Sequence, residues 1–176
     1  MQRFHDETGV RKGVEALAAD IAAAFAPDAP LNIIGIRTRG EVLAQRIASL
    51  LQQRGYSKIA RGVLDITFYR DDFPKNGPGR AILPTELNLE LDDKPLLLVD
   101  DVLFTGRSTR AALNALIDFG RPSVIRLAVL VDRGGRELPI AADFVAYTMK
   151  DVPPSYRVSV HFVETDGADE IVIEPR

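Results

Sequence analysis

Apolar residues recur along the chain in two alternating patterns. Over residues 10–25 they fall every three or four positions, the spacing of a helix that is buried on one side. Residues 31–36 form a short apolar run that is typical of a buried strand, and residues 40–55 return to helical spacing. The same criteria predict further strands at 63–69, 96–99, 124–131, 144–147, 158–163 and 171–173, and a helix at 108–119.

Strands that alternate with helices indicate an α/β fold with a mainly parallel sheet covered on both faces. A length of 176 residues favours one domain, 1–176. Ligands of such sheets bind outside the carboxyl ends of the strands. The segments to examine are therefore those that follow the predicted strands, at 37–40, 70–72, 100–108 and 132–136.

One segment has the composition of an irregular loop. Residues 71–80 hold two prolines, two glycines and an asparagine, which favour turns over helix or strand. We expect a mobile loop there, beside the ligand-binding end of the sheet.

Composition excludes several kinds of site. Without cysteine the chain has no disulfide, zinc finger, iron–sulfur cluster or thiol nucleophile, and two histidines, His5 in an expected tail and His161 in a strand, cannot form a multi-histidine metal site. The net charge of −3 argues against a broad nucleic-acid surface. The polar N-terminus and the short apolar runs indicate a cytoplasmic protein without a membrane span.

Arginine dominates the positive charge, with 17 arginines against five lysines. Arginine forks onto phosphates and carboxylates, and Arg37, Arg39, Arg70, Arg107 and Arg133 follow predicted strands at the ligand-binding end. Five other arginines are interpreted as surface ion pairs or as side chains that extend along the surface to reach water: Arg46, Arg54, Arg61, Arg121 and Arg126.

Residues 96–108 combine a buried strand, two adjacent carboxylates and a small-residue turn that opens a helix. Backbone N–H groups at a helix start bind anions, and the hydroxyl of Thr109 adds a donor. Taken alone, Asp100 and Asp101 are as typical of a helix cap with a solvated neighbour as they are of a ligand-binding site. The strand before them and the turn at 105–108 favour a site for a ribose 5-phosphate, without the Gly-Lys-Ser/Thr of a nucleotide-binding P-loop.

This stretch resembles the signature of type I phosphoribosyltransferases. Residues 35–40, 64–72, 120–122 and 127–139 resemble the PyrR family, whose members regulate pyrimidine genes and are also uracil phosphoribosyltransferases. The resemblance covers nearly the whole chain. It implies the type I phosphoribosyltransferase fold, with helices on both faces of the sheet, a small hood and a flexible loop, and it implies a homodimer or higher homo-oligomer.

The resemblance also assigns roles. Asp100 and Asp101 would bind the ribose hydroxyls, residues 105–109 the 5-phosphate, and residues 131–133 the base, while Mg²⁺ would be held mainly by the substrate, with Asp101 as the candidate side chain. The implied catalytic residues are Asp100, Asp101, Arg39 and Arg70. The implied substrate-binding residues are Thr38, Arg39, Arg70, Asp100, Asp101, Val102, Thr105, Gly106, Arg107, Ser108, Thr109, Val131, Asp132 and Arg133.

The implied reaction converts uracil and phosphoribosyl pyrophosphate into UMP and pyrophosphate. The alternative is a UMP-sensing, RNA-binding attenuation regulator with weak catalysis, and a transferase for a purine base ranks last. RNA binding is weakened here, because Gly135 and Ala141 stand where RNA-binding members often have His and a basic residue. The remaining candidate cations are Arg11, Lys12, Arg136, Lys150 and Arg157.

Overall fold

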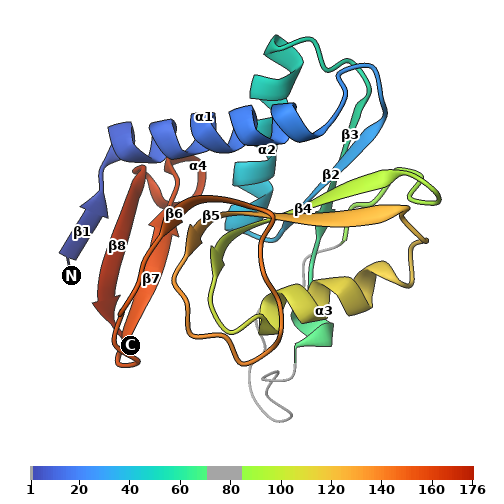
Figure 1. Ribbon diagram of the computed structural model, residues 1–176. Coiled ribbons are helices and arrows are strands. Elements are labelled where there is room, and N and C mark those ends of the chain that lie inside the picture. Colours follow the sequence, from blue (N-terminus) through green and yellow to red (C-terminus); the bar gives the residue numbers. More distant parts are fainter. Residues whose placement is uncertain (1, 71–84) are drawn as a thin grey trace.

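The computed structural model describes residues 2–70 and 85–176, and its centre is a parallel sheet (Figure 1). The expected loop at 71–80 lies outside the described residues. Within the described part five strands pair in the order β3-β2-β4-β5-β6, all parallel. Their bounds are β2 (Leu31–Ile36), β3 (Ile59–Leu64), β4 (Pro95–Leu103), β5 (Val124–Asp132) and β6 (Phe144–Thr148).

Helices cover both faces of this sheet. Alternate residues of a strand point to opposite faces, so Leu97 and Val99 of β4 pack with α1 (Glu7–Ala24) and α2 (Arg39–Gln53). Leu96 and Leu98 pack on the other face with α3 (Arg107–Leu116). Figure 1 shows α1 and α3 on opposite sides of the sheet. The predicted α/β architecture with two covered faces is confirmed.

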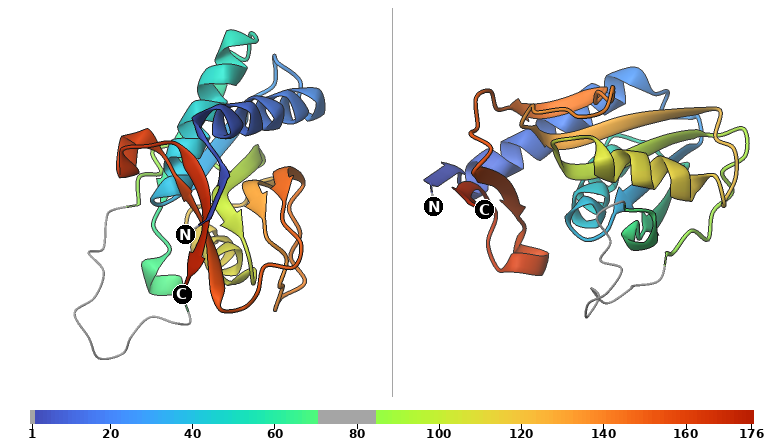
Figure 2. Two further views of the ribbon diagram at one scale, coloured as in Figure 1. Left: turned by 90° about the vertical axis from the view of Figure 1, so that its left-hand side faces the viewer. Right: turned by 90° about the horizontal axis from the view of Figure 1, so that it is seen from below.

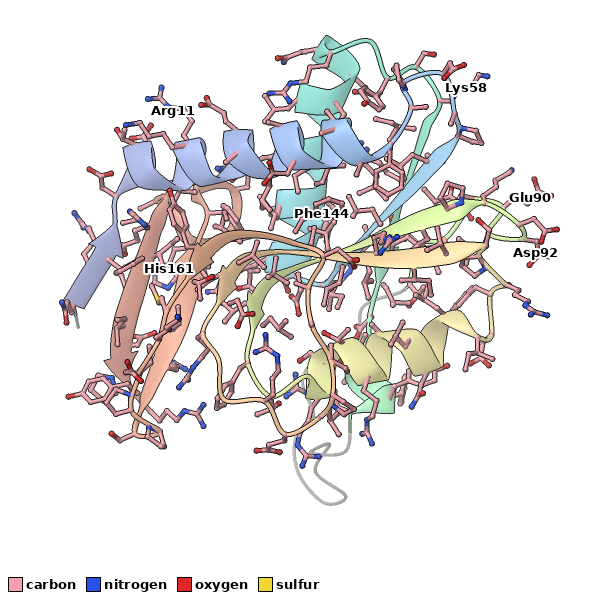
Figure 3. The ribbon with its side chains drawn as sticks, in the orientation of Figure 1. Arg11, Lys58, Glu90, Asp92, Phe144 and His161 are labelled. Carbon is pink, nitrogen blue, oxygen red and sulfur yellow. The ribbon has the colours of Figure 1, made fainter. Side chains whose placement is uncertain are left out.

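A second, smaller sheet stands beside the first (Figure 2). It is antiparallel, with the order β1-β8-β7, and its strands are β1 (Gln2–His5), β7 (Tyr156–His161) and β8 (Glu170–Pro175). The short helix α4 (Val163–Asp166) joins β7 to β8. Figure 3 shows His161 on β7, where its ring nitrogen lies 3.1 Å from Glu170.

The first residues do not form the tail that the sequence suggested. They pair with β8 as strand β1, and the ring of His5 lies 4.0 Å from that of Tyr147 on β6. The Tyr147 hydroxyl donates to the Gly9 carbonyl at 2.7 Å and fixes the start of α1 to the central sheet. This strand was missed because its pairing partner lies at the other end of the chain.

The strand predicted at 63–69 is wrong in its position. Strand β3 ends at Leu64, and Thr67–Tyr69 form a short 3-10 helix, η1. Asp65 causes the change, because its carboxylate accepts from the backbone N–H of Thr67 at 2.8 Å and from the Thr67 hydroxyl at 2.5 Å.

No helix in the described residues is long and apolar enough to span a membrane.

Candidate functional site

The carboxyl ends of β2, β3 and β4 meet around a polar cavity of about 500 Å³, which we call the central cavity. Seven predicted site residues line it: Thr38, Arg39, Arg70, Asp100, Asp101, Val102 and Ser108. The sequence therefore identified residues that the fold brings together from segments far apart in the chain.

The segment after β2 forms the first wall of the central cavity. The peptide bond between Arg37 and Thr38 is cis, and α2 begins directly after it at Arg39. Gly40 lies against the end of β4, so closely that a Cβ atom there would be 2.5 Å from the Val99 carbonyl oxygen. The absence of a side chain at this position lets the loop approach the two aspartates.

Asp100 and Asp101 form the second wall, at the end of β4. Asp100 is buried, and one of its carboxylate oxygens accepts from the Asp101 N–H at 2.9 Å. Burial raises the pKa of Asp100 well above its ordinary value, the charge of Asp101 adds to the rise, and the positive charge of Arg70 opposes it. Burial also raises the pKa of Asp101, against the opposing effects of Asp100 and Arg39.

The predicted phosphate-binding turn borders a second cavity of about 510 Å³, which we call the turn cavity. It shares Arg70, Asp100, Val102 and Ser108 with the central cavity. Thr105, Gly106, Arg107, Ser108 and Thr109 all line it. These residues open α3, so its N-terminal N–H groups can act as donors to an anion there.

Two features fix the shape of this turn. Gly106 has a φ of +91°, in the left-handed region that side chains disfavour, and a Cβ there would be 3.3 Å from Ile140. The Arg107 guanidinium binds Glu137 at 2.6 Å. The carboxylate thus holds the side chain of Arg107 at the rim of the turn cavity.

The predicted base-binding residues are not among those that line the central and turn cavities. Val131 is fully buried in the core. Asp132 and Arg133 border a separate hollow, where Asp132 accepts from the Gly134 N–H at 2.9 Å and binds Arg136 at 2.5 Å. The segment is thus shaped by its own hydrogen bonds.

Arg133 is buried and joins this segment to β7. It donates to the carbonyls of Tyr156 and Val152 at 3.0 and 3.3 Å. Its guanidinium lies 3.9 Å from the centre of the Phe104 ring, and burial lowers its pKa. Phe104 lines the turn cavity, so Arg133 contacts a residue of the cavity wall without lining the cavity itself.

Helix α4 also contributes to the site, although no sequence pattern predicted it. Thr165 and Asp166 line the central cavity, and Asp166 binds Arg39 with both carboxylate oxygens, at 2.6 and 3.1 Å. Arg39 holds the pKa of Asp166 well below its ordinary value. The two residues are 127 positions apart, and no spacing in the sequence links them.

The donor set suits Mg²⁺ held mainly by a substrate. In the described residues no three His, Cys, Asp or Glu side chains are grouped to enclose a metal ion. Asp100 and Asp101 nevertheless offer adjacent hard oxygens on the central cavity. Mg²⁺ commonly takes one or two carboxylates together with substrate phosphate oxygens.

Comparisons with known proteins agree with this geometry. The family model of the phosphoribosyl transferase domain matches residues 2–159. The hypoxanthine phosphoribosyltransferase of Trypanosoma cruzi has the same fold, with a TM-score of 0.71 at 19% identity over 100% of this chain and 98% of that one.

Two relatives share much more of the sequence. The bifunctional protein PyrR of Chloroflexus aurantiacus is 53% identical over 80% of this chain and 77% of its own. That of Desulfosudis oleivorans is 47% identical over 96% of this chain and 93% of its own. The chain therefore belongs to the PyrR family, within the type I phosphoribosyltransferase fold.

Proposed function

We propose that this protein is a uracil phosphoribosyltransferase, which forms UMP and pyrophosphate from uracil and phosphoribosyl pyrophosphate. One observation carries the proposal: two connected cavities place an arginine-bearing loop, two adjacent carboxylates and a helix N-terminus around one space. These three groups match the diphosphate, the ribose hydroxyls and the 5-phosphate of the donor. The family membership supports the same reading.

Asp100 and Asp101 accept hydrogen bonds from the ribose hydroxyls. The turn at 105–109 binds the 5-phosphate through backbone N–H groups and hydroxyls. With both ends of the sugar held, the C1 carbon has a fixed position for attack, which lowers the entropic cost of the reaction. Arg39 and Arg70 border the space left for the diphosphate.

The reaction is a displacement at C1. A ring nitrogen of uracil forms a bond to C1 and releases its proton to water, while the bond from C1 to the diphosphate oxygen breaks and its electrons leave with the diphosphate. Arg39 and Arg70 stabilise the negative charge that grows on the leaving group. Asp101, together with the diphosphate, would hold Mg²⁺, which would supply further charge neutralisation.

Uracil is proposed to lie beside residues 131–133, where main-chain groups would distinguish it from other bases. The hydrogen bonds of Asp132 and the stacking of Arg133 on Phe104 give this segment a fixed shape, and Phe104 itself lines the turn cavity. A fixed main-chain pattern suits the recognition of a small planar base.

The activity is tested by measuring UMP formation from uracil, the donor and Mg²⁺. We expect UMP between about pH 6 and 9, with hypoxanthine and guanine as poor competitors. No UMP under any of these conditions would contradict the proposal, and efficient use of a purine would replace uracil as the base.

Ser108→Leu gives a structural check on the same reaction. Ser108 borders both cavities, so the larger side chain should block the phosphate site and reduce the rate at least about 100-fold, or ~2.7 kcal/mol. Ser49→Leu is the matched control, because Ser49 is exposed on α2 and its hydroxyl donates to the Gln45 carbonyl outside both cavities. Equal losses in the two variants would contradict the assignment of the turn.

A second function has support from the relatives, which carry the name bifunctional protein PyrR. We propose as the alternative that the protein senses UMP and binds the leader RNA of pyrimidine genes. Action in the cytoplasm and assembly into a homodimer or larger homo-oligomer belong to the same proposal. Light scattering of the purified protein measures the oligomeric state directly.

A further inference from the structure

Two arginines of α2 bind the segment that joins β7 to β8. Arg39 and Arg46 lie seven residues apart, so they project from the same side of the helix. Arg46 binds Glu164 and Asp169, each at 2.6 Å, and its guanidinium lies 4.8 Å from the centre of the Phe162 ring. This contact anchors α4 against α2 outside the central cavity.

Arg39 makes the corresponding contact inside the central cavity. Its guanidinium binds Asp166 through Nη2 at 2.6 Å and Nε at 3.1 Å. Asp166 is itself held by two further donors, the Phe162 N–H at 3.1 Å and the Thr165 hydroxyl at 2.7 Å. A two-point pair with a carboxylate that is fixed in this way sets the direction of the guanidinium.

Asp101 is a second carboxylate whose charge attracts Arg39. Both side chains line the central cavity, and the positive charge of Arg39 acts on the Asp101 carboxylate. If Arg39 paired with Asp101, it would cover a carboxylate that the ribose hydroxyls need. The same movement would withdraw the guanidinium from the space left for the diphosphate.

We infer that Asp166 is a positioning residue for donor binding, which holds Arg39 toward the diphosphate and keeps it away from Asp101. The inference rests on the proposed function, because it takes phosphoribosyl pyrophosphate as the ligand. Asp166 acts through Arg39 and not on the substrate itself. Asp166 places a negative charge at the rim of a site for a polyanion, and the guanidinium of Arg39 that it binds balances this charge.

The test compares the affinities of variants for the donor and for inorganic pyrophosphate, both with Mg²⁺, by calorimetry. Asp166→Asn should raise both dissociation constants about tenfold, which corresponds to ~1.4 kcal/mol. Asp166→Glu keeps the charge and should show a smaller rise, and it serves as the second variant if Asp166→Asn lowers the melting temperature. Glu164→Gln is the matched control, because it breaks an ion pair between the same helices outside the central cavity, and it should leave both constants unchanged.

A double-mutant cycle separates positioning from a general effect on the fold. In an Arg39→Ala background, Asp166→Asn should change the dissociation constants less than about twofold, since the residue through which it acts is gone. A loss of the same size in both backgrounds would overturn the inference. An equal loss of affinity in Glu164→Gln would also overturn the inference, because any weakening of the contact between α4 and α2 would then have the same effect as the loss of the Asp166 charge.

Two other outcomes are informative. Tighter binding in Asp166→Asn would show that Asp166 competes with the ligand for Arg39, which contradicts the inference and leaves the proposed function intact. Wild-type protein that binds pyrophosphate and not the donor would contradict the proposed function, and the pyrophosphate series would still test the role of Asp166. Wild-type protein that binds neither ligand contradicts both.

Discussion

At the scale of single residues, the two aspartates near the end of β4 lower the stability of the fold at the place where they form the site. Asp100 is buried beside a second carboxylate, and both circumstances disfavour its charged form. Its pKa is therefore higher in the folded chain than in the unfolded chain, where the side chain is in water. As the pH rises from the ordinary pKa of an aspartate to the raised one, the unfolded chain loses its proton first and stability falls.

Asp100→Asn should relieve this cost. The amide oxygen can still accept from the Asp101 N–H, and no charge is buried. We expect the melting temperature at pH 7 to rise by about 2–4 °C, the change that ~1 kcal/mol makes in a chain of this size. The gain should shrink as the pH falls toward 4, while UMP formation is lost. Calorimetry across this pH range decides the matter, and a gain that does not depend on pH would contradict the account.

Asp101→Asn tests the ribose contact with less effect on the fold, because Asp101 is more exposed than Asp100. An amide accepts a weaker hydrogen bond from a hydroxyl than a carboxylate does. We expect kcat/KM for the donor to fall about 100-fold, equivalent to ~2.7 kcal/mol of transition-state stabilisation. Steady-state kinetics at varied donor concentration measure this fall in kcat/KM. Unchanged kinetics would contradict a contact between Asp101 and the ribose.

At the scale of elements, local patterns predicted the parts of the fold that local physics determines. The buried runs of β2, β4 and β5 have nearly all of their central residues in the core, and the sequence shows them as continuous apolar segments. The segment 63–69 has a strand-like composition, but Asp65 closes a turn and η1 forms instead. Strand β1 is exposed and is stabilised by pairing with β8, which no local pattern records.

Glycine contacts show how elements meet at the site, and Gly40 provides a test. Its contact with the Val99 carbonyl leaves no room for a methyl group, so Gly40→Ala should push the loop at 37–40 away from the aspartates. We expect a loss of more than about 2 kcal/mol in unfolding free energy, together with a higher KM for the donor. Denaturant unfolding and kinetics measure the two effects.

Gly55→Ala is the control for this experiment. Gly55 has a φ of +93° and open space around it, so alanine there meets only backbone strain, of about 1 kcal/mol. Its kinetics should match those of the wild type. A donor KM that rises equally in both variants would show that the loop does not depend on its contact with β4.

At the scale of the whole molecule, the arginines serve mainly to connect segments. The composition predicted an anion site, and Arg39 and Arg70 do line the central cavity. Five other arginines bind carboxylates: Arg46 with Glu164, Arg107 with Glu137, Arg126 with Asp143, Arg136 with Asp132 and Arg157 with Glu174. The candidate site could be predicted where it follows strands. Helix α4 could not, because its place depends on two long-range ion pairs, Arg39 with Asp166 and Arg46 with Glu164.

The same pairs bear on RNA binding. Of the five candidate cations, Arg136 and Arg157 are bound to carboxylates. Arg11, Lys12 and Lys150 are exposed, and Arg11 projects from the outer side of α1 (Figure 3). RNA affinity rises with the number of phosphates that a protein neutralises. Three exposed cations, two of them adjacent on α1, provide little of this interaction on a chain of net charge −3.

We therefore expect the protein to bind pyrimidine leader RNA no more tightly than about 10⁻⁶ M at physiological salt, the range of non-specific binding. Gel shifts with and without UMP measure it, and UMP should make no difference. In the variant Arg11→Ala/Lys12→Ala, the slope of log affinity against log salt should fall by at most about two, because each cation releases about one counterion. Nanomolar binding that depends on UMP would contradict the expectation and would make attenuation the principal function, with the arginines of the central cavity sensing the nucleotide.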